Sequence, residues 1–214
     1  MLLGRNEREM EITRTLCLTP SRVSCVNYDL SATEFPRHGM FEDFIAGGIH
    51  GLVHSAGISI ICPLRTHDVR FVIESLQVNL ISAMELIRKL ECNFYRDSSV
   101  VIVSSVMSVV GQAAKLSYCS SKGAIDAAVR SLAIELAPKM IRVNSVLPGV
   151  VDTPLSRLLF TKLPETNKKD LLIKHPLGLG NPIDVSAAVC FLLSADSTHI
   201  TGSNITIDGG YTAS

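Results

Sequence analysis

The strongest constraint on the fold is the alternation of short apolar runs with longer segments of helical periodicity. Residues 98–105 (SSVVIVSS) are rich in β-branched residues, which is typical of a strand buried on both faces. Residues 68–91 place apolar side chains near helical spacing, at Val72, Leu76, Leu80, Met84 and Ile87. Strands that alternate with such helices form βαβ units, so the pattern predicts an α/β fold with a doubly wound parallel sheet.

The same alternation predicts the other elements. Further strands are expected at residues 1–4, 22–30, 48–57, 141–149 and 204–210. Leu52 and Val53 are expected to form the core of the strand at 48–57. Further helices are expected after Asn6 and at residues 33–48, 117–139 and 181–196. Residues 155–180 show no clear period and predict a substrate loop or lid.

Length, composition and charge limit the classes of protein to which the chain can belong. The 214 residues fit one domain over 1–214, and 47% hydrophobic residues suggest much surface buried in the fold or in subunit contacts. The 20 basic and 20 acidic residues form no basic stripe, so nucleic acid is not an expected partner. The six cysteines lack metal-ligand spacing, so we expect no metal site and a reducing, cytoplasmic location. Residues 44–64 carry no formal charge, but a strand and a turn explain them better than a membrane span.

A tyrosine and a lysine four residues apart are the first sign of chemistry. Tyr118 and Lys122 share one face of the helix expected over 117–139, so the ammonium can lie near the phenol. A nearby positive charge would lower the tyrosine pKa from about 10 and allow proton transfer near neutral pH. Taken alone, this spacing is more often an ordinary feature of a solvated helix face.

The surroundings of this pair strengthen the chemical interpretation. Ser105 ends the strand expected over 98–105 and precedes Tyr118 in the chain. The carboxyl ends of parallel strands line the ligand crevice of an open sheet. Three strand ends, with the sequences HSAG, SS and LPG, are therefore expected to face one crevice beside the tyrosine and the lysine.

Eight short segments, in order, resemble the short-chain dehydrogenase/reductase family. They are GRNE, YDLS, VHSAG, VNLISA, SSVMSVVG, YCSSK, RVNSVLPGVVDTP and ITGSNITIDGG. The resemblance runs from Leu2 to Tyr211 and is to the single-domain branch that is similar to 3-oxoacyl-carrier-protein reductases and sugar or polyol dehydrogenases. It implies a Rossmann-like fold and an oxidoreductase that interconverts a carbonyl and a secondary alcohol, both small molecules, by hydride transfer with a nicotinamide cofactor.

The resemblance also implies four catalytic residues. Tyr118 would be the general acid/base, and Lys122 would lower its pKa and hold the nicotinamide ribose hydroxyls. Ser105 would bind the substrate oxygen. Asn79, in VNL, would hold a water in a proton relay behind Lys122. The alternative for Asn79 is a polar helix residue paired with backbone.

A set of cofactor-binding residues follows from the same resemblance. Tyr118 and Lys122 belong to it, and Asp29 would contact the adenine, although Asp29 could instead cap a helix. The other implied positions are Leu30, Ser55, Ala56, Gly57, Pro148, Gly149, Val151 and Thr153.

Arg5 bears on the choice of cofactor. In the family, an acid after the second strand binds the NAD ribose, and a neighbouring arginine accommodates the NADP phosphate. Here Gly4 stands at the acid position and Arg5 follows it, so NADP(H) is favoured over NAD(H). The alternative for Arg5 is a solvated charge at a helix start.

The sequence departs from the family pattern in two places. In VHSAG, His54 and Ser55 replace two asparagines, and we expect His54 to pack within the strand. The TGxxxGxG turn that cradles the pyrophosphate in the family does not occur. MLLGRNE resembles the second family strand, so the first strand, which lies between the second and fourth, would be missing. We expect that the sequence is a truncated or mis-started reading of a complete enzyme. One alternative is a natural short form that has lost cofactor binding. Another is that the remaining strands, or a partner chain, close the gap in the sheet.

Other functions and the assembly state complete the expectations. A non-catalytic interaction protein would keep the family core without nucleotide, and the absent glycine-rich turn favours it. A sugar-nucleotide epimerase or dehydratase shares YxxxK but carries a substantial C-terminal substrate domain. Segments 76–90 and 121–136 are apolar on more than one face. Since the corresponding family helices pack between subunits, we expect a homodimer or homotetramer.

Overall fold

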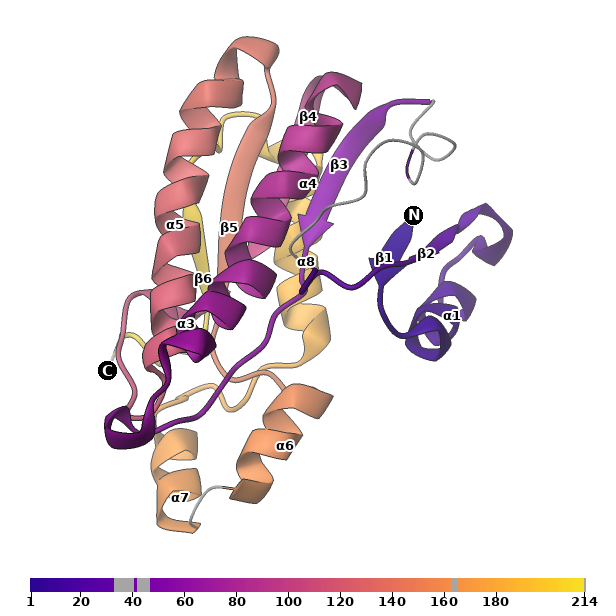
Figure 1. Cartoon of the computed structure of the whole chain (residues 1–214). Helices are drawn as coiled ribbons and strands as arrows, with labels where there is room; N and C mark the ends of the chain where they lie inside the picture. The colour runs from indigo at the N-terminus through magenta and orange to yellow at the C-terminus, as the bar shows by residue number, and fades with distance from the viewer. Residues whose placement is uncertain (33–40, 42–46, 163–164, 214) are drawn as a thin grey trace.

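A parallel sheet with helices on both faces forms the body of the protein (Figure 1). The computed structural model describes residues 1–32, 41, 47–162 and 165–213. Four parallel strands pair in chain order: β3 (Ile49–His54), β4 (Phe94–Val103), β5 (Arg142–Pro148) and β6 (Asn204–Ile207). A separate parallel pair joins β1 (Leu2–Gly4) and β2 (Cys25–Asn27). The expected Rossmann-like α/β class is confirmed.

The helices are α1 (Glu7–Thr15), α3 (Val69–Leu76), α4 (Ser82–Leu90), α5 (Leu116–Leu136), α6 (Pro154–Lys162), α7 (Glu165–Ile173) and α8 (Pro182–Leu193). Their ends follow ordinary capping chemistry. The Asn6 side chain accepts from the Glu9 N–H before α1, at 3.2 Å. Pro182 begins α8, and the Asp184 carboxylate accepts from the Asn181 N–H at 2.7 Å.

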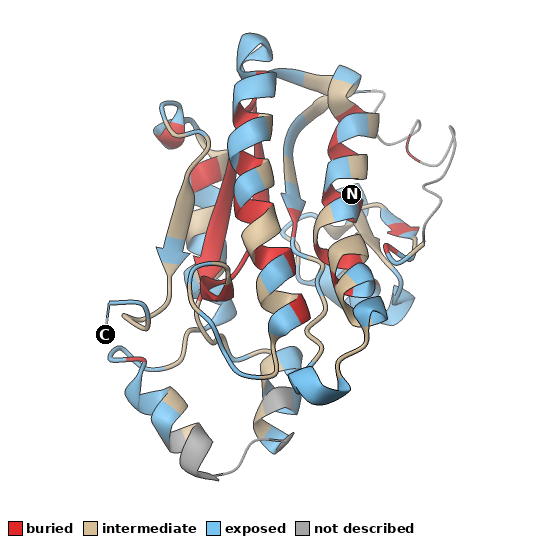
Figure 2. Ribbon diagram, turned by 60° about the vertical axis from the view of Figure 1, so that its left-hand side comes forward, coloured by how far each residue is buried: buried red, intermediate tan, exposed pale blue. Residues whose placement is uncertain are grey.

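Strand β4 shows why the chain forms layers. Val100 and Ile102 pack in the cluster that contains residues of α4 and α5, whereas Val101 packs against residues of α8. Successive side chains of a strand point to opposite faces, so one β-branched run serves both layers. Figure 1 shows α3, α4 and α5 on one face of the sheet and α8 on the other, and in Figure 2 the buried residues follow the central strands and the helix faces against them.

The long helix expected over 68–91 is confirmed, with one addition. Helices α3 and α4 are joined without a break by a π-helical turn at Gln77–Ile81. Such turns are rare and concentrate at functional sites. This one carries the buried side chain of Asn79.

Four expectations need comment. Residues 155–180 contain helices α6 and α7, so the prediction of an irregular loop is wrong for most of this segment. Leu52 and Val53 lie within β3, as expected, and Val53 is 41% exposed. His54, expected to pack within the strand, is buried with 3% exposure. The helix expected over 33–48 lies almost entirely outside the described residues.

The strand pair β1–β2 and the four-stranded sheet are linked by side-chain packing. Val26 and Leu30, on and after β2, cluster with Leu86 and Leu90 of α4. The Gln77 side chain also donates to the Ala32 carbonyl, at 3.0 Å. Within the part of the chain that the structure describes, β1 and β3 do not pair with each other. No helix in that part is both long and apolar enough to cross a membrane.

Candidate functional site

A cavity of about 510 Å³ opens at the carboxyl ends of the central strands. Ser55 and Gly57 follow β3, Ser105 follows β4, and Gly149 follows β5. The other walls of the cavity are formed by side chains at the start of α5 and on α6, α7 and α8. These side chains are Lys115, Tyr118, Lys122, Leu155, Phe160, Leu171 and Val189. The prediction that the three strand ends face one crevice is confirmed, and Figure 1 shows α6 and α7 beyond these strand ends.

Tyr118 lies in the first turn of α5, half-buried in the cavity wall. The ammonium groups of Lys115 and Lys122 lie 5.3 Å and 5.6 Å from the centre of its ring. Burial raises the pKa of Tyr118, and a hydrogen bond with Ser105 acts in the opposite direction. The expected net lowering of the Tyr118 pKa is therefore wrong for the protein alone.

Lys122 is buried one turn further along α5, with 4% exposure. Its Nζ donates to the Val103 carbonyl at 2.7 Å, at the end of β4. Burial lowers the pKa of Lys122 to about 8, and the Asp126 carboxylate acts in the opposite direction. The lysine is thus held on the strand end that precedes Ser105.

The side-chain amide of Asn79 forms hydrogen bonds through both its oxygen and its nitrogen, and these bonds connect three segments of the chain. Its Oδ1 accepts from the Ile58 N–H at 2.8 Å, and its Nδ2 donates to the Ile58 carbonyl at 3.1 Å and to Ser121 Oγ at 2.8 Å. Gly57 lies beside it: an added Cβ would stand 3.3 Å from Asn79 Oδ1 and 3.6 Å from Lys122 Nζ. Gly57 and Lys122 line the cavity, and Asn79 lies buried beside Gly57.

Ser105 is placed by the turn that follows β4. Its backbone is extended, with φ −169°, and its Oγ accepts from the Met107 N–H at 3.2 Å. The residue is 7% exposed and lines the cavity. Ser105 and Tyr118 are thereby brought together, as the sequence predicted.

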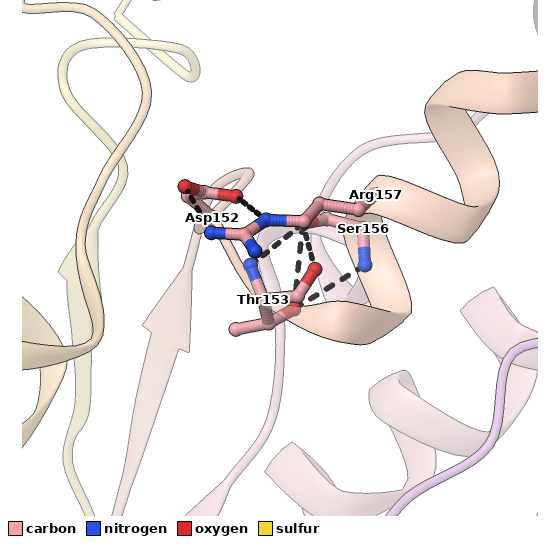
Figure 3. A network of polar contacts seen from close by, with 4 residues as sticks. All are labelled: Asp152, Thr153, Ser156 and Arg157. Carbon is pink, nitrogen blue, oxygen red and sulfur yellow. Dashed lines mark hydrogen bonds and ion pairs between the residues drawn. The ribbon is translucent and has the colours of Figure 1, made fainter.

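The segment after β5 is held by a network of polar contacts (Figure 3). Arg157 donates twice to the Asp152 carboxylate, at 2.7 Å and 2.9 Å. Thr153 and Ser156 exchange hydrogen bonds at the start of α6, among them Thr153 N–H to Ser156 Oγ at 2.9 Å. These contacts fix Thr153 and the neighbouring Val151 at the cavity.

His175 holds the same segment from its other side. Its Nε2 accepts from the Val150 N–H at 3.2 Å, while Nδ1 lies 2.7 Å from the Leu171 carbonyl. The carbonyl can only accept, so Nδ1 carries the proton. The ring is buried and packs against Tyr211, with 4.8 Å between the ring centres.

The remaining expected cofactor residues lie away from the cavity lining. Arg5 follows β1, and its Nη1 is 4.0 Å from Asp29 Oδ2 in an exposed pair. Asp29 caps the turn after β2, and the Ser31 N–H donates to it at 2.9 Å and lowers its pKa. Leu30 and Ala56 pack in the apolar cluster around Leu86 and Leu90. The structure thus brings Arg5 and Asp29 together.

Two residues that shape the site were not found by sequence reasoning: Lys115, which lines the cavity, and His175, which holds Val150 beside it. Lys115 lies three residues before Tyr118, and helical spacing on the N-terminal side of the tyrosine could have revealed it. His175 had no local signal, because its partners Val150 and Leu171 come from two different segments.

Known proteins resemble this chain in sequence and in fold. A family model described as Enoyl-(Acyl carrier protein) reductase matches residues 8–212. The 3-oxoacyl-[acyl-carrier-protein] reductase of Thermotoga maritima is 40% identical over 116 residues, 54% of this chain and 46% of that protein. Matches to such curated relatives cover between 42% and 66% of their lengths, so the chain spans about half to two thirds of them.

Solved structures show the same fold. A short chain dehydrogenase family protein from Francisella tularensis has a TM-score of 0.78 at 31% identity, over 89% of this chain and 82% of that one. A 4-hydroxyisoleucine dehydrogenase, in complex with NADH, has a TM-score of 0.83 at 26% identity, over 99% of this chain and 87% of that one.

Proposed function

Since the chain belongs to the short-chain dehydrogenase/reductase family, we propose that it interconverts a carbonyl and a secondary alcohol, with Tyr118 as general acid/base and NADP(H) as cofactor. The observation that carries the proposal is the convergence of Ser105, Tyr118 and Lys122 on one cavity at the strand ends. A small-molecule substrate fits the cavity, whose walls are apolar around these few polar groups.

The residues fit the nicotinamide half of the cofactor. A side chain at Gly57 would crowd Asn79 and Lys122, so the glycine leaves room for close approach to both. Lys122 Nζ retains two protons beyond its bond to Val103 and would hold the ribose, beside Pro148, Gly149 and Ser55. When bound, the nicotinamide would supply or accept the hydride. The relative 4-hydroxyisoleucine dehydrogenase is itself complexed with NADH.

The preference for NADP(H) rests on Arg5. Its guanidinium is exposed and only loosely paired with Asp29 at 4.0 Å, so a 2′-phosphate could replace that carboxylate. Asp29 would then face the adenine, with Leu30 beside it. The sequence contains no TGxxxGxG turn, so this support concerns the two ends of the cofactor and not its pyrophosphate.

The protonation states favour Tyr118 as a proton donor. Because burial raises its pKa, the phenol is protonated at neutral pH and can donate to a carbonyl oxygen that Ser105 also binds. Asn79 Oδ1 keeps a lone pair beyond its bond with Ile58 and could hold a relay water.

The assembly and location remain proposals. Ile134 of α5 and Met84 of α4 are exposed apolar side chains on the helices expected between subunits, which supports a homodimer or homotetramer. All six cysteines are free thiols, which a reducing cytoplasm would preserve.

A non-catalytic interaction protein is the second candidate, favoured by the absent glycine-rich turn. The two candidates are separated by titrating NADPH and NADH into the 214-residue chain and assaying reduction of a panel of ketones. The catalytic proposal expects saturable NADPH binding and turnover. A correctly folded chain with neither property would overturn it and leave the interaction protein.

A further inference from the structure

The side chains of Lys115, Tyr118 and Lys122 lie along one face at the beginning of α5. Tyr118 lies three residues after Lys115 and four before Lys122, so the three positions recur at helical spacing. Lys115 is the N-cap residue of α5, and Tyr118 and Lys122 lie within the helix. Both ammonium groups lie close to the Tyr118 ring, 5.3 Å and 5.6 Å from its centre.

Lys115 has no counter-charge. It is half-buried, and burial lowers its pKa. Among the described residues no carboxylate forms an ion pair with it, and the described cavity lining contains two charged residues, Lys115 and Lys122, both basic. Lys122, in contrast, is bound to the Val103 carbonyl. A partly desolvated ammonium without an anionic partner is unfavourable, and an anion in the cavity would relieve it.

The backbone before Lys115 is fixed. Ala114 has a φ of 63°, in the left-handed region that is unfavourable for a residue with a Cβ. Its carbonyl accepts from the Cys62 N–H at 2.8 Å, which ties this turn to the segment after β3. Strained residues persist where the surroundings hold them and concentrate at ligand sites.

We propose that Lys115 binds a carboxylate carried by the substrate, so that the enzyme acts on keto acids and hydroxy acids. The inference rests on the proposed function and names its substrate class. One point charge suits a carboxylate, whereas a phosphate dianion calls for more donors. The walls formed by Met107, Leu155 and Phe160 suit the hydrocarbon part.

Because of the position of Lys115, the proposed site for the substrate carboxylate is separate from the anionic groups of the cofactor. Lys122 would hold the ribose from its place on the Val103 carbonyl, whereas Lys115 caps the beginning of α5, before Tyr118 in the chain. A carbonyl oxygen at the Tyr118 hydroxyl and a carboxylate at Lys115 would be only a short chain apart. Oxo acids with a few carbons between the two groups are therefore the expected substrates.

The test compares acids with their neutral esters. NADPH-dependent reduction of 4-oxopentanoate, 3-oxobutanoate and their ethyl esters is measured for the wild type, Lys115→Gln, Lys115→Arg and the control Lys139→Gln. Lys139 lies in an exposed pair with Glu91, so its replacement makes the same charge change outside the cavity. Lys115→Met replaces Lys115→Gln if the latter does not fold.

The wild type is expected to prefer the acids. Lys115→Gln should lower the acid-to-ester ratio of kcat/KM by about 10- to 100-fold, as loss of a charged hydrogen bond does. Lys115→Arg should retain most of the ratio, and Lys139→Gln should retain all of it. An unchanged ratio in Lys115→Gln, or a wild type that prefers the esters, would overturn the assignment.

Failure of the proposed function is distinguishable. If the wild type reduces neither acids nor esters, calorimetric titration with 4-oxopentanoate tests the carboxylate site directly. Binding that weakens about tenfold in Lys115→Gln supports the site. Absent binding, or equal affinity in both proteins, rejects it.

Discussion

Asn79 and Ser121 are joined by a hydrogen bond of 2.8 Å between the amide Nδ2 and the hydroxyl Oγ. Ser121 in turn donates to the Tyr118 carbonyl, also at 2.8 Å. The amide of Asn79 is bound to both backbone groups of Ile58 as well. The π-helical turn is therefore coupled through one side chain to the turn of α5 that carries Tyr118.

Tyr118→Phe should abolish turnover and leave the fold intact. The change removes one hydroxyl from a half-buried ring and deletes the proposed proton donor. General acid catalysis contributes roughly 10²- to 10⁴-fold, so kcat should fall by at least about 100-fold. Steady-state kinetics measure the loss, and circular dichroism checks the fold. Activity close to that of the wild type would refute the role of Tyr118.

Arg5→Gln should weaken NADPH binding about tenfold and leave NADH binding nearly unchanged, because the lost charge would face only the 2′-phosphate. Fluorescence titration gives both dissociation constants. Arg8→Gln is the matched control, since Arg8 is an exposed arginine in the first turn of α1. Equal weakening by both variants would indicate a general charge effect and contradict the specificity assigned to Arg5.

His54 should make the protein less stable in mild acid. Burial, helped by the nearby charge of Lys122, lowers the pKa of His54 to about 4 from 6.5. Between these values the unfolded chain binds a proton that the folded protein does not. The contribution to the free energy of unfolding is complete above pH 6.5 and is lost as the pH falls to about 4, with a limit of about 3 kcal/mol.

Urea denaturation at several pH values measures this effect. His54→Asn should flatten the pH dependence of the unfolding free energy between 6.5 and about 4. His199→Asn removes an exposed histidine and is the control. If the two variants show the same pH profile as the wild type, His54 does not titrate in this way.

Gly149→Ala should destabilise the protein by about 1–3 kcal/mol, because the site has too little room for the added methyl group. The Cβ would stand 2.9 Å from Asp208 Cα and 3.0 Å from His175 Nε2, so backbone must move. Gly111→Ala places its Cβ with nothing within 4 Å and should change stability by less than about 0.5 kcal/mol. Chemical denaturation compares the two, and equal effects would contradict the close packing around Gly149.

The sequence anticipated those features that depend on local pattern. The β-branched run of β4 and the spacing of Tyr118 and Lys122 carry their own periodicity, so the sheet and the tyrosine–lysine face could be predicted. Ser105 followed from its place at a strand end.

Features set by distant contacts were not anticipated. The π-helical turn at Asn79 is held by Ile58 and Ser121, which no local pattern reveals. The edge position of β3 among the described strands, where Val53 is 41% exposed, depends on distant pairing as well. The direction of the Tyr118 pKa was predicted from the charge of Lys122, but burial raises this pKa and the hydrogen bond with Ser105 is what acts against the burial.

The division between the strand pair β1–β2 and the four-stranded sheet has a consequence for cooperativity. No ladder of backbone hydrogen bonds joins β1 to β3 in the described residues, so β1 and β2 are coupled to the rest mainly by apolar contacts such as Leu30 with Leu86, beside the hydrogen bond from Gln77 to the Ala32 carbonyl. Such contacts lack the directionality of a strand ladder. The N-terminal unit can therefore open as a separate foldon while the four-stranded sheet stays closed, and Arg5 travels with the unit that opens.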